Sequence, residues 1–89
     1  VDVIVYPTTK VLAPSRNDLD EGKWTTFTYP TNTLIASQSW LPALTVPAGF
    51  IGNLPLGLEF MGIPYGERGL ISKAFAFEKF TDHRRAPSI

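Results

Sequence analysis

The sequence predicts an α/β fold, because its apolar residues follow two different periods along the chain. Strands are expected near residues 2–6, 43–48 and 55–62, where apolar residues either run almost without a break or alternate with others. A short apolar helix is expected near residues 32–40, and a longer one near 67–81, where apolar side chains recur at spacings of one, three and four. The predicted order is therefore strand, long loop, helix, two strands and a final helix.

The first predicted strand is rich in β-branched residues, which is typical of a parallel, interior strand buried on both faces. Pro7 ends it, because proline has no backbone N–H to donate to a ladder. The polar stretch from Thr8 to Thr26 is expected to form a long surface loop, with one helical turn near Arg16 to Asp20.

The middle of the chain carries signals for a helix end and a hairpin. Thr31 or Asn32 is expected to cap the following helix through a side-chain oxygen, and Pro42 lies just beyond its end. Between the second and third strands, Gly52 and Asn53 tolerate positive φ and are expected to turn a hairpin.

Alternation along the third strand places Gly57, Glu59 and Met61 on one face and Leu58 and Phe60 on the other. The glycine indicates that another group approaches the backbone closely there. If its face is buried, the carboxylate of Glu59 requires a partner, because an unpaired buried charge is costly.

The composition excludes several classes of protein. The formal net charge is zero, which removes the usual electrostatic argument for nucleic acid or an anionic membrane as a partner. There is no cysteine and a single histidine, so neither a disulfide framework nor a structural metal site is expected. The lack of cysteine favours the cytoplasm, although a secreted protein that avoids thiols has the same composition.

The sequence also suggests a piece of a larger core. It opens on Val1 rather than methionine, and it combines many aromatic residues with seven glycines and eight prolines in only 89 residues. A chain this short buries only about 60–65% of the surface that it exposes when unfolded, less than a larger domain does, so such large side chains are expected to need a larger partner layer. A compact, aromatic-rich domain is the alternative.

Several blocks in register resemble one known family. They are T-V-P-A-G-F at 45–50, L-P-L-G-L-E-F-M-G at 54–62, D-V-I-V-Y-P-T-T at 2–9 and L-P-A-L-T-V-P at 41–47, followed by a closing helix and a basic, proline-containing tail. Together they resemble the C-terminal part of the amidase signature family. The resemblance implies a mixed sheet layered with helices, and a single C-terminal segment over residues 1–89 that is incomplete on its own.

Enzymes of that family hydrolyse or transfer amides with a Ser–cis-Ser–Lys triad, and the resemblance places that triad in the N-terminal part of the parent protein. Lys10 follows the wrong strand to be its lysine, and Ser37 and Ser39 are separated by Gln38 in a predicted helix. No catalytic residue and no metal or other cofactor is therefore expected in this chain, which alone is expected to be inactive.

The resemblance instead implies one wall of a substrate cleft, formed by the stretch before the Pro-Ala pair, with two aromatic residues adding apolar lining. The candidate residues are Tyr29, Thr31, Asn32, Thr33, Ser37, Trp40 and Phe50. The family usually has glycine where this chain has Trp40 and a small polar residue, often asparagine, where it has Ser37, so the pocket shape is expected to differ.

The expected partners are the remainder of the amidase chain, a small-molecule amide substrate of the parent, and other copies of the isolated segment through self-association. Two alternatives stay open. The chain could be a stand-alone binding or interaction module whose aromatic residues form a docking face, or it could belong to a catalytically inactive family member.

Overall fold

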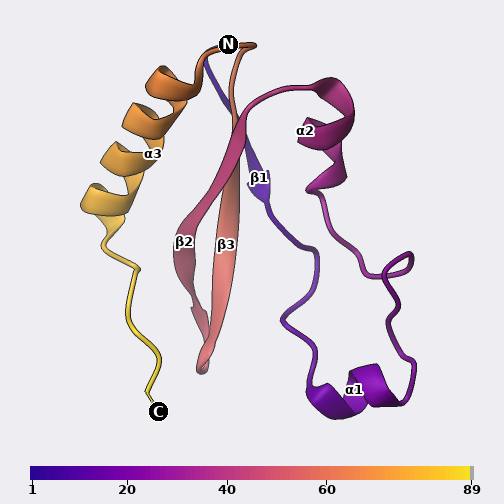
Figure 1. The fold of residues 1–89 in the computed structure, drawn as a ribbon. Helices are drawn as coiled ribbons and strands as arrows, with labels where there is room; N and C mark the ends of the chain where they lie inside the picture. Colours follow the sequence, from indigo (N-terminus) through magenta and orange to yellow (C-terminus); the bar gives the residue numbers. More distant parts are fainter. Residues whose placement is uncertain (89) are drawn as a thin grey trace.

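The computed structural model describes residues 1–88, which form a three-stranded antiparallel sheet with helices on both sides (Figure 1). The strands occur in the order β1-β3-β2. The elements are β1 (Ile4–Pro7), α1 (Arg16–Asp20), α2 (Leu34–Ser39), β2 (Ala43–Ile51), β3 (Leu54–Met61) and α3 (Glu67–Thr81). The predicted α/β class is confirmed, and the predicted bounds of the last helix are those observed.

Strands β2 and β3 form the predicted hairpin. Ile51 pairs with Leu54 across the two-residue turn, and Gly52 takes a positive φ of 60° there. The pairing register of β2 on β3 shifts between Pro47 and Gly49, which marks a β-bulge. Gly49 has a φ of 139° there, a backbone conformation that favours glycine.

Strand β1 differs from its prediction as a parallel, interior strand. It pairs antiparallel with β3, at an edge of the described sheet, with Val5 opposite Phe60. The side chains of Ile4 and Val5 are 49% and 43% exposed, so they are not buried within residues 1–88. A continuous apolar run indicates that a strand is to be covered, but it specifies neither its partner nor its direction.

Helix α3 packs against β2 and β3 on one face of the sheet and forms the main core (Figure 1). The core consists of Val46, Phe60, Leu70 and Ala74, each less than 7% exposed. The ring of Phe77 adds a tilted aromatic contact, 5.4 Å from that of Phe60 between centroids. Leu58 and Phe60 thus share one face of β3, as the alternation predicted, and the structure places that face toward α3.

A long loop between β1 and α2 is closed at its base. The backbone N–H of Lys10 donates to the carbonyl of Pro30, and that of Asn32 donates to the carbonyl of Thr8. The short helix α1 lies far from the sheet within this loop, and Ser15 caps it with a reciprocal capping box (Figure 1). The loop therefore fixes where the chain re-enters the sheet layer at the start of α2.

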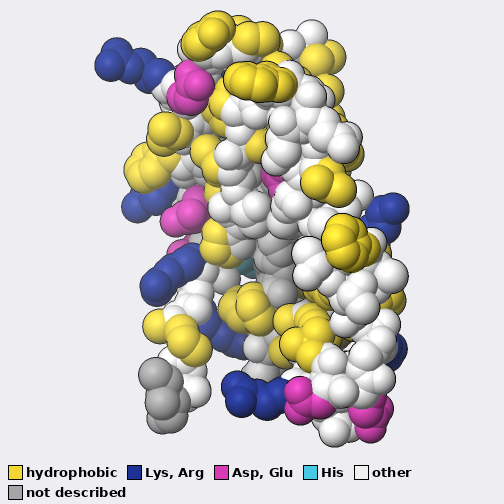
Figure 2. Space-filling view, turned by 45° about the vertical axis from the view of Figure 1, so that its right-hand side comes forward, with side chains coloured by type: hydrophobic (Ala, Val, Ile, Leu, Met, Phe, Trp, Pro, Cys, Tyr) yellow, Lys and Arg dark blue, Asp and Glu magenta, His cyan; other side chains and the backbone are white. Residues whose placement is uncertain are grey.

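Much apolar surface remains exposed for a chain of this size, and Figure 2 shows it spread across one face of the molecule. A stable monomer rarely presents large contiguous apolar patches, so these side chains indicate surfaces built to be covered. The most exposed large side chains, apart from the terminal valine, are Phe27, Trp40, Tyr65 and Phe80.

The close approach predicted at Gly57 gives a stability test. A Cβ at this position would lie 2.7 Å from Cγ2 of Thr45 and 3.1 Å from Oγ1 of Thr8. Gly57→Ala is therefore expected to lower the free energy of unfolding by about 1–3 kcal/mol, measured by urea denaturation. The matched control is Gly69→Ala, because a Cβ there meets only the end of the Lys73 side chain.

The control lies on the exposed side of α3, where alanine is a better helix former than glycine. Gly69→Ala is expected to leave stability unchanged or raise it by about 0.5–1 kcal/mol. Equal destabilisation by both variants would contradict the steric account of Gly57.

Candidate functional site

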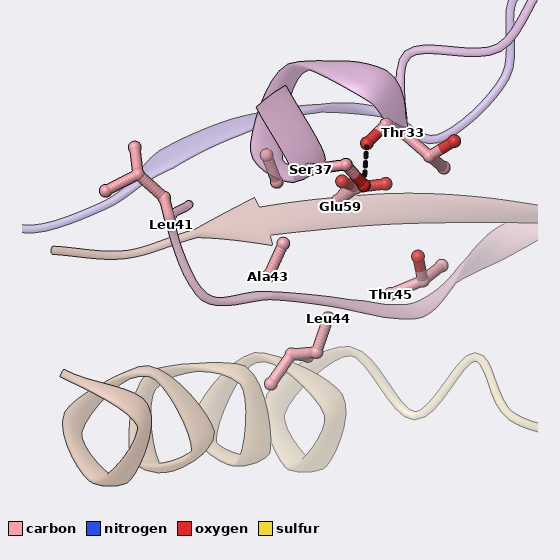
Figure 3. Close-up of a pocket in the computed structure, with 8 residues that line it drawn as sticks. Thr33, Ser37, Leu41, Ala43, Leu44, Thr45 and Glu59 are labelled. Atoms are coloured by element: carbon pink, nitrogen blue, oxygen red, sulfur yellow. Dashed lines mark hydrogen bonds between the residues drawn. The ribbon is translucent and has the colours of Figure 1, made fainter. Parts of the chain in front are cut away.

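A groove lies between α2 and the sheet face opposite α3, and we call it the α2 groove (Figure 3). Its volume is about 440 Å³. Hydroxyl groups reach it from the helix and from β2, and one carboxylate reaches it from β3. Its lining residues are Thr33, Ala36, Ser37, Leu41, Ala43, Leu44, Thr45 and Glu59. Leu44 contributes little side chain, because it points toward α3 (Figure 3).

Glu59 lies at the floor of the α2 groove, in the middle strand of the sheet. It is only 3% exposed, and its cross-strand neighbours are Tyr6 on β1 and Thr45 on β2. The hydroxyl of Tyr6 donates a hydrogen bond of 3.0 Å to one carboxylate oxygen, Oε1. The buried carboxylate thus has the partner that the sequence required, and that partner is a neutral one.

The same contact changes the acidity of the tyrosine. Burial, followed by the hydrogen bond to Glu59 and the negative charge of that group, raises the pKa of Tyr6 to about 12 from the usual 10.0. Each cause disfavours the phenolate, which would face a carboxylate in a poorly solvated position. Tyr6 therefore remains a hydrogen-bond donor throughout the neutral range.

Hydroxyl groups continue this polar face beyond Glu59. The Oγ1 atoms of Thr8 and Thr45 lie 3.1 Å apart, on either side of Gly57. From above, the Ser37 hydroxyl donates to the carbonyl of Thr33 at 3.5 Å, and both residues lie over Glu59 (Figure 3). The groove therefore offers hydroxyls that both donate and accept around a single acidic group.

Of the residues predicted to contact substrate, Thr33 and Ser37 line this groove. Thr31 and Asn32 do not cap α2, which contradicts the predicted role in helix capping. The helix begins after Thr33, whose side chain makes no capping hydrogen bond. The Asn32 amide donates instead to the carbonyl of Pro7 at 2.8 Å, and the Thr31 hydroxyl donates to that of Thr8 at 3.3 Å.

The structure separates the three aromatic candidates from the α2 groove. Tyr29 lines another cavity beside Trp24, with their rings edge to face at 6.0 Å. Trp40 ends α2 in a left-handed conformation, with φ of 58°, and is 91% exposed. Phe50 lies near the hairpin turn under the guanidinium of Arg85, whose Cζ is 3.9 Å from the ring centroid.

Sequence reasoning did not include Glu59, Thr45 or Tyr6 in the site. The alternation of β3 placed Glu59 on the face now known to meet α2, and that signal could have been used. Tyr6 lies beside Glu59 because β1 pairs with β3, and the sequence pattern did not predict that pairing. Within residues 1–88, no group of three or more His, Asp or Glu residues is arranged to hold a metal ion.

The Tyr6–Glu59 contact predicts how the protein titrates in alkali. Because the folded-state pKa is raised, the contact stabilises the fold fully below about pH 10 and loses this effect as the pH rises through about 12. Ultraviolet titration of the phenolates should show a component with pKa about 12 that Tyr6→Phe removes. If Tyr6→Phe lowers the total absorbance change but leaves the component with the raised pKa in place, the contact is contradicted.

None of the α-helices in residues 1–88 is long and apolar enough to cross a membrane. No model of a known protein family matches the chain. Individual relatives do match it. The chain is 32% identical over 90 residues to a glutamyl-tRNA(Gln) amidotransferase subunit from Sulfurihydrogenibium sp. (strain YO3AOP1), covering all of this chain and 19% of the relative.

The corresponding subunit from Methanosarcina barkeri is 34% identical over 91 residues, with the same coverage of both chains. Among solved structures, the peptide amidase PAM bound to the competitive inhibitor chymostatin superposes with a TM-score of 0.80 at 37% identity, over all of this chain and 17% of that one. The chain thus spans less than a fifth of these relatives. The matches show that it belongs to the amidase signature family, in which it corresponds to the C-terminal segment.

Proposed function

We propose that this chain is the C-terminal part of an amidase signature hydrolase that acts on carbon–nitrogen bonds of amides. Its role is to supply scaffold and one wall of the substrate cleft. The observation that carries this role is the α2 groove, which Thr33 and Ser37 line on the helix side and the buried carboxylate of Glu59 lines on the sheet side. Small-molecule sites commonly combine apolar walls with a few convergent polar groups, and this groove has that composition.

The chemical step belongs to the rest of the enzyme under this proposal. Acyl transfer needs a nucleophile, a base and donors for the developing oxyanion. The family's Gly- and Ser-rich stretch with its serine pair does not occur in this sequence, so the nucleophile has to come from another segment. The wall residues would act by orienting the amide, which is a large part of the barrier reduction in such reactions.

The other candidates take different places in the proposal. Thr31 and Asn32 act as positioning residues, because they tie the start of α2 to the end of β1. Tyr29, Trp40 and Phe50 lie outside the α2 groove and would contact substrate only at a more distant part of a long cleft. A stand-alone binding module and an inactive family member remain the alternatives to an active parent.

The gene sequence upstream of Val1 distinguishes these alternatives. An active parent requires an upstream reading frame with the family's lysine and serine pair. An extension that lacks them would identify an inactive member. A reading frame that begins at this segment would identify a stand-alone module and contradict the proposed function.

The wall role predicts a binding defect when a groove hydroxyl is lost. In the intact enzyme, Ser37→Ala is expected to raise KM about 3- to 10-fold with little change in kcat, because a hydrogen bond common to ground and transition states is removed. Ser39→Ala is the matched control: its hydroxyl, like that of Ser37, donates to a backbone carbonyl four residues earlier, but Ser39 does not line the groove. Equal KM values for the two variants would argue against the wall.

The exposed apolar surfaces predict that the isolated segment self-associates. Strand β1 is an unpaired sheet edge with half-exposed Ile4 and Val5, and the outer side of α3 exposes Ile71 and Phe75. Light scattering of the purified chain at tens of micromolar should give the mass of a dimer or larger assembly. A well-dispersed amide spectrum from a stable monomer would show that these surfaces need no cover.

A further inference from the structure

The single hydrogen bond from Tyr6 is little compensation for a carboxylate as deeply buried as that of Glu59. The residue is 97% buried by area, yet its hydrogen-bond partner within residues 1–88 is the neutral hydroxyl of Tyr6. None of the other residues lining the α2 groove is titratable, so nothing there balances the carboxylate charge. A buried carboxylate is normally compensated by a cation or by several donors.

The second carboxylate oxygen has room for such a donor. Tyr6 binds only Oε1 of Glu59. If Oε2 were fully buried, it would be a buried oxygen without a partner, and no such side-chain atom occurs within residues 1–88. The second oxygen therefore keeps contact with open space, and the space that Glu59 lines is the α2 groove. The Ser37 hydroxyl lies above the Glu59 carboxylate, beside the Thr33 carbonyl to which it donates, and its oxygen can accept a further hydrogen bond (Figure 3).

We propose that Glu59 anchors a subsite in the α2 groove for a cationic N–H donor, a primary ammonium or a guanidinium group. The donor would bind the free carboxylate oxygen of Glu59 and give a second hydrogen bond to the hydroxyl of Ser37 or the carbonyl of Thr33. Such a charge-assisted pair is stronger than one with a neutral donor. A divalent metal fits less well, because one carboxylate is too few of the anionic ligands that it prefers.

The cation can come from two sources. It is either an amino or guanidino group on the amide substrate, or a Lys or Arg side chain from elsewhere in the enzyme. The first source rests on the proposed function, because it makes the groove part of the substrate cleft. The second requires only that the chain folds as part of a longer protein.

The test compares Glu59→Gln with wild type in the intact enzyme, using paired amide substrates that differ only in an amino group. Glutamine keeps the shape and the bond from Tyr6 but removes the charge. For a substrate cation, KM of the amino-bearing amide should rise about 10-fold or more, while KM of the neutral amide and the melting temperature stay unchanged. For an enzyme side chain, the melting temperature should fall and both KM values should shift alike.

Glu67→Gln is the control, because Glu67 is exposed in the first turn of α3. A Glu59→Gln enzyme that matches this control in melting temperature and in both KM values would overturn the subsite. Turnover of the neutral amide by the wild-type enzyme reports separately on the proposed function, since it shows amide hydrolysis whether or not the subsite binds a cation.

A measurement on the wild-type enzyme covers the case in which Glu59→Gln does not fold. Propylammonium should compete with the amino-bearing substrate, whereas tetramethylammonium, which has the charge but no N–H, should not. Competition by propylammonium alone supports the substrate source. If neither ion competes, the substrate source is excluded and the cation must be an enzyme side chain. In that case Glu59→Asp, which keeps the charge, is expected to fold, whereas Glu59→Gln is not. Failure of both variants to fold would contradict a role for the charge.

Discussion

The buried carboxylate of Glu59 in the middle strand is the constraint on which the rest of this structure depends. An acidic group can lie inside a sheet only if neighbouring strands supply hydrogen-bond donors, and here Tyr6 comes from β1. This pairing fixes the register of β1 on β3, because a shift of one residue would turn the tyrosine to the opposite face. The register in turn sets where the long loop leaves the sheet.

The two faces of the sheet consequently have different roles. The face toward α3 buries Phe60 and its apolar neighbours and forms the main core of the segment. The face toward α2 carries Glu59 and a row of threonines and encloses a groove rather than a packed core. Gly57 keeps this face open enough for Thr8 and Thr45 to meet across the strand. Polar groups on such a face stabilise the fold less than apolar packing would.

Local patterns in the sequence predicted the elements that depend on local physics. The bounds of α3 and the Gly52–Asn53 hairpin follow from periodicity and turn chemistry, and both were correct. The glycine common in the family at the position of Trp40 also has a local explanation, because that residue ends α2 in a left-handed conformation. Trp40 adopts it at a steric cost and points into solvent.

Features that depend on distant contacts could not be predicted in this way. The direction of β1 and the hydrogen bonds of Asn32 to residues 7–8 depend on which strands pair. The local sequence does not indicate that pairing. The candidate site was therefore predicted only in part. Thr33 and Ser37 were found from the family resemblance, whereas Glu59 was expected only to need a partner if its face was buried, and was not assigned to their groove.

We expect the α2 groove to face the substrate of a larger amidase. A crystal structure of the intact enzyme with a bound amide inhibitor would show whether it does. Inhibitor atoms are expected within hydrogen-bonding distance of Ser37 or Thr33. A groove filled by other segments of the protein, with the inhibitor bound elsewhere and no contact to residues 29–59, would contradict it.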